Sequence, residues 1–176
     1  LLHICCANCA IYPVRQLREQ HHRVTGFFFN PNIHPYQEYR RRLDTLRDYA
    51  GRTDLTVVYR DEYLLEEFLS QVAAAPRSRC GFCYQWRMEE TARHAAASGY
   101  DAFTTSLLYS RFQKHELIRD YGQALAHRYG IEFFYQDFRT GWNAGIDASR
   151  AMGLYRQQYC GCIYSEQDRY HPQRNN

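Results

Sequence analysis

Seven cysteines lie in three short groups along the 176-residue chain: Cys5, Cys6 and Cys9; then Cys80 and Cys83; then Cys160 and Cys162. Single buried cysteines act as small apolar side chains and are scattered along a sequence. Cysteines this closely spaced, in three groups, are typical of a thiolate site for a soft metal centre or of a redox-active pair. The sequence therefore predicts a metal or redox centre.

Disulfide staples are the other common use of dense cysteines, in small secreted domains that bury little core. Here the number of cysteines is odd, two of them are adjacent, and no signal peptide is visible before Cys5. No run approaches the ~18 apolar residues that a membrane span needs. We therefore expect a cytoplasmic protein with reduced thiols and no membrane association.

Apolar patterning predicts the elements that position these groups. Strands are predicted by short apolar runs at residues 1–4, 24–29, 55–59, 102–105 and 131–135. Helices are predicted by helical spacing at residues 11–20, 36–49, 63–72, 86–97, 114–129 and 143–152. Because alternating strands and helices indicate parallel βαβ units, we expect one α/β domain over residues 1–176. It should be a three-layer α/β/α sandwich with a mostly parallel sheet.

The predicted sheet places the first cysteines at an edge where ligands bind. In open parallel sheets, ligand sites lie beyond the carboxyl ends of the strands. Cys5, Cys6 and Cys9 follow the first strand, where a nucleotide-binding protein would carry a glycine-rich phosphate loop. No glycine lies there, so we expect thiols in place of a phosphate site. Cys80 and Cys83 begin a helix, whose N-terminal dipole favours thiolates.

Longer motifs carry a resemblance to a known family. They include His3-Ile4-Cys5-Cys6-Ala7-Asn8-Cys9, Asn30-Pro31-Asn32-Ile33-His34-Pro35, Cys80-Gly81-Phe82-Cys83-Tyr84 with Arg87, and Tyr155-Arg156-Gln157-Gln158-Tyr159-Cys160-Gly161-Cys162. On these motifs the chain resembles, almost end to end, the QueH-type epoxyqueuosine reductases. Two positions depart from the family pattern. Asn8 stands where Pro is usual, which we expect to change backbone stiffness alone, and Arg111 stands where the usual run is Ser-Pro-Tyr, which removes a fixed turn.

The resemblance implies a fold of the adenine-nucleotide alpha-hydrolase (HUP-like) type and a two-electron reduction of epoxyqueuosine in tRNA. The epoxide oxygen would leave as water and the product would be queuosine. It also implies a [4Fe–4S] cluster, a second mononuclear iron and an unidentified electron donor. No side chain supplies such electrons, whereas an iron–sulfur cluster does.

The cysteines are assigned as follows. We expect Cys5, Cys6, Cys80 and Cys83 to hold the cluster, because two loops at one sheet edge would then grip it. Cys9 is a candidate ligand of the second iron. Cys160 and Cys162 are either further ligands of that iron or a strained, redox-active disulfide.

A proton donor and an RNA-binding surface are also needed. Asp137 follows the last predicted strand, and we expect its neighbour Phe138 to raise its pKa so that it protonates the epoxide oxygen. Its alternative role is an N-cap or a salt bridge to Arg139. All but one of the 22 basic residues are Arg, which suits phosphate binding, and Arg77 and Arg79 are the candidates closest to Cys80.

Two other functions stay open at this point. A thiol–disulfide oxidoreductase would need only one pair, Cys80 with Cys83 or Cys160 with Cys162, and would leave Cys5 unexplained. A zinc-stabilised RNA-binding module would need thiolates without catalysis, although adjacent cysteines are uncommon in structural zinc sites. An iron–sulfur protein is brown, whereas these two alternatives are colourless.

Overall fold

A computed structural model describes residues 1–171 and contains a five-stranded sheet. The strands are β1 (Leu2–His3), β2 (Gly26–Phe28), β3 (Val57–Tyr59), β4 (Ala102–Thr105) and β5 (Glu132–Phe133). Their order is β3-β2-β1-β4-β5, and all neighbouring pairs are parallel, with Leu2 opposite both Gly26 and Thr104. The predicted parallel sheet is confirmed, and four of its strands are shorter than the apolar runs that predicted them, whereas β4 has the predicted bounds.

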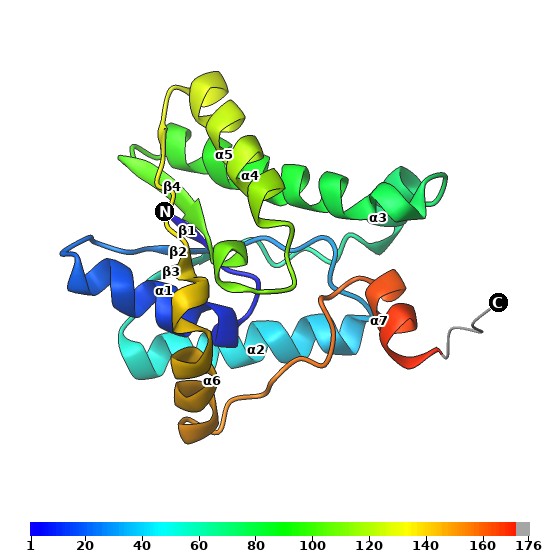
Figure 1. Cartoon of the computed structure of the whole chain (residues 1–176), viewed down its shortest axis with the longest axis horizontal. Coiled ribbons are helices and arrows are strands. Elements are labelled where there is room, and N and C mark those ends of the chain that lie inside the picture. The colour runs from blue at the N-terminus through cyan, green and yellow to red at the C-terminus, as the bar shows by residue number, and fades with distance from the viewer. Residues whose placement is uncertain (172–176) are drawn as a thin grey trace.

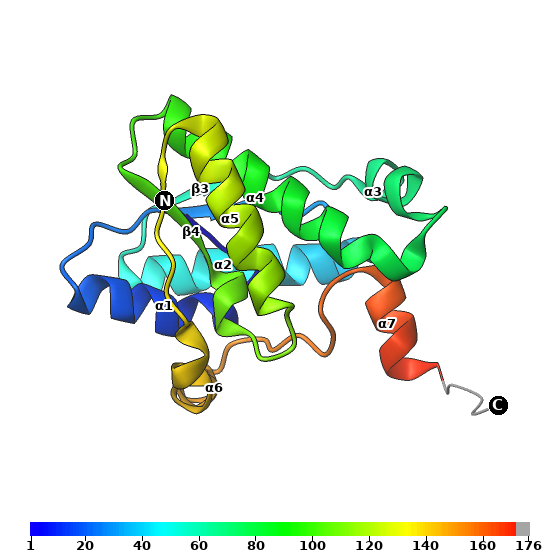
Figure 2. The same ribbon diagram turned by 45° about the horizontal axis from the view of Figure 1, so that its top comes forward.

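Helices cover both faces of the sheet, which confirms the three-layer arrangement (Figure 1). One face carries α1 (Ala7–Glu19), α2 (Tyr36–Thr53) and α6 (Trp142–Ala151), and the other carries α4 (Arg79–Ala97) and α5 (His115–Tyr129). Figure 2 shows α3 (Leu65–Val72) and α7 (Ile163–Tyr170) beyond the sheet, near the first turns of α2 and α4. A transmembrane helix is not found among residues 1–171.

Burial explains why the strands appear in the sequence as short apolar runs. Leu2, Phe27 and Phe28 are fully buried because helices cover both faces of a parallel sheet. On α2 the buried residues recur at steps of three and four, including Leu43 and Leu46, so that one face of the helix packs on the core.

Three of the differences from the sequence expectations concern cysteines. Helix α1 begins at Ala7, with Cys6 as its N-cap residue. Helix α4 begins at Arg79, seven residues before the predicted start, so Cys80 and Cys83 lie in its first two turns. Helix α7 follows Cys162 and was not predicted, because none of its residues is buried and it therefore has no apolar periodicity.

The strand order reverses between β1 and β4. From β1 the chain proceeds outward through β2 and β3, and then returns to place β4 on the other side of β1. The loops that follow β1 and β4 meet here: the backbone N–H of Cys5 donates to the Ser106 hydroxyl at 3.2 Å, and His3 Nδ1 lies 2.9 Å from Thr105 Oγ1. Such a switch point is the usual ligand site of an open α/β sheet.

Two helical glycines give opposite predictions for stability. A Cβ atom at Gly122 of α5 would lie 2.3 Å from the Phe133 ring of β5, whereas a Cβ at Gly51 of α2 would meet nothing within 4 Å. Gly122→Ala should therefore lower the free energy of unfolding by about 1–3 kcal/mol through overpacking. Gly51→Ala should raise it by about 0.5–1 kcal/mol through helix propensity. Urea denaturation measures both, and equal effects would contradict this packing of α5 on β5.

Candidate metal and substrate site

The first cysteine group forms a compact trio at the end of β1. The Sγ atoms of Cys5, Cys6 and Cys9 all lie within 4.8 Å of one another, and the Cys5 and Cys6 sulfurs are 3.8 Å apart. All three residues are buried. Tetrahedral coordination at a metal–sulfur distance of about 2.3 Å places two thiolates ~3.8 Å apart, so this spacing suits one metal ion.

The three thiols of the trio shift one another's pKa values. Hydrogen bonds from Cys6 and Cys9 hold the pKa of the Cys5 thiol well below its usual value. The same hydrogen bonds to Cys5 raise the pKa of Cys6 and of Cys9, and burial adds to both increases. Cys5 is therefore the sulfur that ionises first.

The other four cysteines lie near one another. Cys83 and Cys162 share a small apolar cluster with Phe68 and Val72, while Cys80 packs against the main core. Burial raises the pKa of the Cys83 thiol to about 12, and the neighbouring charges of Cys160, Cys162 and Cys80 add to the increase. All seven cysteines are free thiols, so the structure contains no disulfide between Cys160 and Cys162.

Arg87 lies between the two sets of cysteines. Its residue is 1% exposed, its Nε donates to the Cys83 carbonyl at 3.1 Å, and its Nη2 has no hydrogen-bond partner within the described residues. Burial lowers the pKa of this guanidinium, and the charges of Cys83, Cys160 and Cys5 raise it by more. A buried cation of this kind requires nearby negative charge, and Cys5 is the thiol whose lowered pKa favours supplying it.

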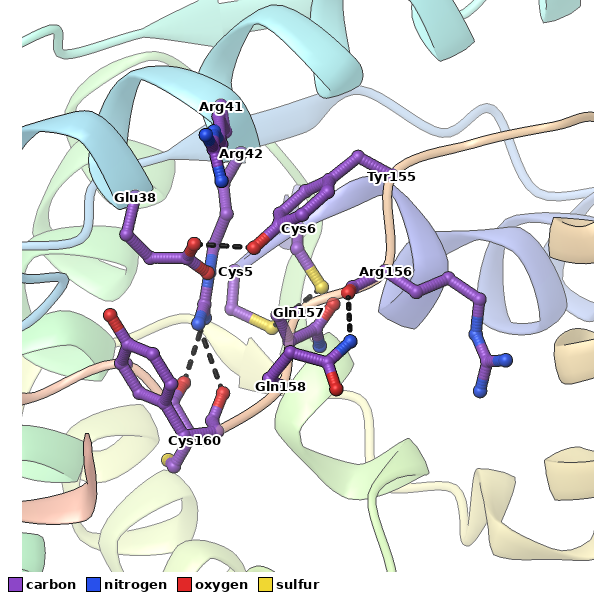
Figure 3. Close-up of polar contacts among 12 residues, drawn as sticks. Cys5, Cys6, Glu38, Arg41, Arg42, Tyr155, Arg156, Gln157, Gln158 and Cys160 are labelled. Carbon is purple, nitrogen blue, oxygen red and sulfur yellow. Dashed lines mark hydrogen bonds and ion pairs between the residues drawn. The ribbon is translucent and has the colours of Figure 1, made fainter. Parts of the chain in front are cut away.

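Arg42 fixes the last cysteine group (Figure 3). This buried guanidinium on α2 donates to the carbonyls of Cys160 at 2.8 Å and Tyr159 at 2.9 Å, and its Nε pairs with Glu38 at 2.7 Å. Gly161 fits against it with a φ of +154°, and a Cβ there would lie 3.0 Å from Asn32 and 3.3 Å from Arg42. A larger residue at position 161 would therefore push the segment off its anchor.

Asn8 attaches the same segment to α1. Its side-chain amide donates to the Tyr155 carbonyl and to the Gln157 side chain, each at 2.8 Å, and its carbonyl accepts from the Ser149 hydroxyl. The expectation that Asn8 changes backbone stiffness alone is wrong, because a proline has no side-chain polar group to make these contacts. The turn near Arg111 is held instead by the Ser110 hydroxyl, which accepts from the Phe112 N–H at 3.3 Å.

A cavity of about 610 Å³ opens onto both cysteine sets. Cys5, Cys9 and Cys160 line it, and so do the residues that contact their sulfurs. Gln157 Nε2 donates to Cys9 Sγ at 3.6 Å, and Gln113 Nε2 donates to Cys160 Sγ at 3.5 Å. A substrate in this cavity would therefore lie against both groups of thiols.

Asp137 lies outside the residues that line this cavity. It is the N-cap of the short helix η3 (Phe138–Gly141), accepts from the Arg139 N–H at 3.0 Å and pairs with the Arg139 guanidinium at 2.6 Å. These hydrogen bonds lower the pKa of Asp137 to about 2, although partial burial opposes the change. The expectation that Phe138 raises this pKa is wrong, because the charge-assisted contacts of Arg139 outweigh desolvation.

Arg77 and Arg79 differ in their availability. Arg79 pairs with Asp168 of α7 and donates to the Pro76 carbonyl at 2.8 Å, whereas Arg77 is exposed in η1 (Pro76–Ser78). Neither of them lines the cavity, so as RNA contacts they stay predictions.

Comparison with known proteins identifies the family. Residues 1–168 match the family described as "Epoxyqueuosine reductase QueH". The chain belongs to the QueH family. A Dehalococcoides mccartyi protein named epoxyqueuosine reductase QueH is 37% identical over 97% of this chain and 93% of its own length. Proteins of the same name from Thermotoga maritima (33% identity; 94% of this chain and 88% of the relative) and Streptococcus pyogenes (30%; 94% and 69%) are similar too.

Sequence patterns assigned no role to several polar groups around these cysteines and the cavity: Glu38, Arg42, Arg87, Ser106, Gln113 and Gln157. Arg42 belongs to a run of three arginines on α2 that resembles a solvated helix face, and only the fold shows that it is buried. The sequence did give a signal for Arg87 and Gln157, because both lie in the motifs that indicated the family.

Removing the Arg42 guanidinium should loosen the last cysteine group of this QueH-family chain. Arg42→Met leaves Glu38 buried without its counter-charge, so the free energy of unfolding should fall by about 3–5 kcal/mol. Arg40→Met is the matched control on the same helix, because Arg40 pairs with partly exposed Asp44 and Asp61 and should contribute about 0–1 kcal/mol.

Hydrogen exchange locates the effect of Arg42→Met. Amides at positions 159–161 should exchange faster in Arg42→Met than in Arg40→Met under native conditions. Equal exchange in the two variants would show that Arg42 does not anchor this segment.

Proposed function

We propose that this chain is an epoxyqueuosine reductase, an oxidoreductase that acts on tRNA. The observation that carries the proposal is the cavity at the switch point of a QueH-family fold, lined by thiols from both sets of cysteines. In the proposed reaction, the epoxide takes two electrons and two protons, the ring becomes an alkene, and the oxygen leaves as water. A separate, unidentified electron donor supplies the two electrons, and the cytoplasm is the expected compartment.

The donor set fits an iron–sulfur centre. Seven free thiols, three helix N-termini that carry them and the unpartnered Nη2 of Arg87 are what a buried, negatively charged metal–thiolate centre requires. When bound, such a centre supplies one-electron transfer at a potential that no side chain reaches. Family membership does not favour the two alternatives, a thiol–disulfide oxidoreductase and a zinc-stabilised RNA-binding module.

The geometry favours one division of the cysteines. Cys5, Cys6 and Cys9 have the spacing of ligands to a single metal, which leaves Cys80, Cys83, Cys160 and Cys162 as the four thiolates for a [4Fe–4S] cluster. This division differs from the sequence expectation, in which Cys5 and Cys6 joined Cys80 and Cys83. It is supported by the influence of the other three thiols, Cys80, Cys160 and Cys162, on the pKa of Cys83.

The polar residues around the thiols have defined tasks in this proposal. Gln157 and Gln113 donate amide N–H groups to the sulfurs of Cys9 and Cys160, and the Ser106 hydroxyl donates to Cys5 Sγ at 3.6 Å. Donors to sulfur stabilise its negative charge and orient the side chain for a metal. Arg87 adds a fixed positive charge between the two sets.

Anaerobic turnover tests the function directly. Reconstituted protein, reduced with dithionite, should convert epoxyqueuosine in tRNA to queuosine, detected by mass spectrometry of the nucleosides. The reconstituted protein should be brown and bleach on reduction. A colourless protein that exchanges disulfides, or one that binds RNA without turnover, would instead support one of the two alternatives.

Two cysteine variants distinguish the two divisions. We expect Cys6→Ser to lose about one iron per chain while keeping the cluster spectrum, and Cys162→Ser to lose most iron and sulfide. The sequence-based division predicts the reverse, with the cluster lost in Cys6→Ser and kept in Cys162→Ser. Iron and sulfide analysis with electron paramagnetic resonance decides between the two divisions. If a variant keeps both the cluster and the single iron, the substituted cysteine is not a ligand.

Asp137 stays a proposed proton donor, with one condition added by its ion pair. A pKa near 2 leaves the carboxylate ionised at neutral pH, so donation requires that bound substrate draw Arg139 away. Asp137→Asn should then slow single-turnover reduction by ~100-fold. Arg139→Gln should raise the pKa of Asp137 and move the decline of rate with rising pH to higher pH. A wild-type rate in Asp137→Asn would show that the ion pair of Asp137 and Arg139 stabilises its loop and has no role in proton transfer.

A further inference from the structure

A row of aromatic rings leads from the core to the mouth of the cavity. The ring centroids of Tyr109 and Trp142 are 5.2 Å apart, and those of Phe112 and Trp142 are 5.6 Å apart in an edge-to-face arrangement. Phe112 lines the cavity although its residue is 83% exposed, which places it at the opening. Its ring is therefore supported on one side by Trp142 and left uncovered on the other.

A single exposed apolar side chain is common on a protein surface, but Phe112 is also part of the cavity lining. Four other large apolar or aromatic side chains in residues 1–171 are exposed, but only by 37–55%. Phe112 is thus the most exposed of these side chains, and it lies where a ligand that enters the cavity would meet it.

Unpaired arginines flank this ring. The Arg111 guanidinium lies over Trp142 at 5.8 Å, and Arg156 lines the cavity beside the Cys160 segment. Burial raises the pKa of the Tyr109 hydroxyl, and the charges of Arg156 and Arg111 oppose this, so both guanidinium groups lie near the same wall. Within residues 1–171 neither pairs with a carboxylate, and Figure 3 shows Arg156 extending away from Glu38.

Flat rings beside free guanidinium groups suit single-stranded nucleic acid. Unpaired bases stack on aromatic side chains, and arginines bind the phosphates that connect those bases. We propose that Phe112, supported by Trp142, stacks an unpaired base next to the modified nucleotide, while Arg111 and Arg156 contact its phosphates. This inference rests on the proposed function, because it names the part of the tRNA that this site holds.

The RNA footprint predicted here differs from the one at Arg77 and Arg79. Those two residues lie outside the cavity, and Arg79 is already paired with Asp168. An RNA loop that crosses the cavity mouth would contact Arg111 and Arg156 first.

Binding of a fluorescein-labelled anticodon stem-loop RNA to the reconstituted protein tests the proposal. Phe112→Ala should weaken binding about 5- to 100-fold, the range for loss of one base–aromatic stack, whereas Phe112→Tyr should keep it. Tyr36→Ala is the matched control, because Tyr36 is an exposed aromatic residue outside the cavity lining, and it should bind as wild type. An RNA with an abasic residue beside the modified position should bind wild type weakly and show no further loss with Phe112→Ala.

Salt dependence tests the phosphate contacts. Arg111→Ala and Arg156→Ala should each reduce the slope of log affinity against log salt by about one unit. A reduced slope in the double variant Arg77→Ala/Arg79→Ala, with no change in Arg111→Ala and Arg156→Ala, would move the RNA to the other surface and overturn the proposal.

Turnover separates this proposal from the proposed function. Wild-type affinity in Phe112→Ala, together with reduction of epoxyqueuosine in tRNA by wild type, would overturn the stacking proposal alone. Stem-loop binding that depends on Phe112, with no turnover by wild type, would support the RNA surface and overturn the reductase.

Discussion

The site depends on the hydrogen bonds that the buried guanidinium of Arg42 makes. The segment that carries Cys160 has no regular secondary structure between α6 and α7, so its own backbone does not fix its position. Arg42 supplies the missing hydrogen bonds, and Glu38, one turn earlier on α2, holds the Arg42 side chain in place. Buried ion pairs add little net stability compared with apolar packing, but they favour one arrangement over its alternatives. In this chain that arrangement brings the last cysteines to the sheet edge.

A second constraint is charge. Each cysteine group begins a helix: Cys6 caps α1, Cys80 lies in the first turn of α4, and Cys162 caps α7. Helix N-termini carry partial positive charge, which stabilises thiolates that burial would otherwise disfavour. Arg87 supplies a full positive charge from the middle of α4. The fold thus places positive charge beside each of the three groups of cysteines.

Sequence patterns predicted the layers and the sheet edge because burial of a strand or of a helix face leaves a local spacing of apolar residues in the sequence. They did not predict α7, which buries no residue. They placed Cys80 and Cys83 at the start of a helix, as in α4, although the helical spacing was recognised only over residues 86–97. The pKa of Asp137 was mispredicted because Arg139, two residues away, folds back on it. Arg42 and Asn8 were missed because their partners lie more than a hundred residues away along the chain.

The two sets of cysteines also differ in how far apart their members lie along the chain. Cys5, Cys6 and Cys9 come together through the first turn of one helix, whereas Cys83 meets Cys162 only when distant segments dock. Closing a long loop takes more conformational entropy than closing one helical turn, so non-local contacts form later in folding. The trio therefore depends mainly on local structure, whereas the contact between Cys83 and Cys162 depends on the docking of distant segments. Under the proposed division of the cysteines, the single-metal site would need less of the fold than the four-cysteine site.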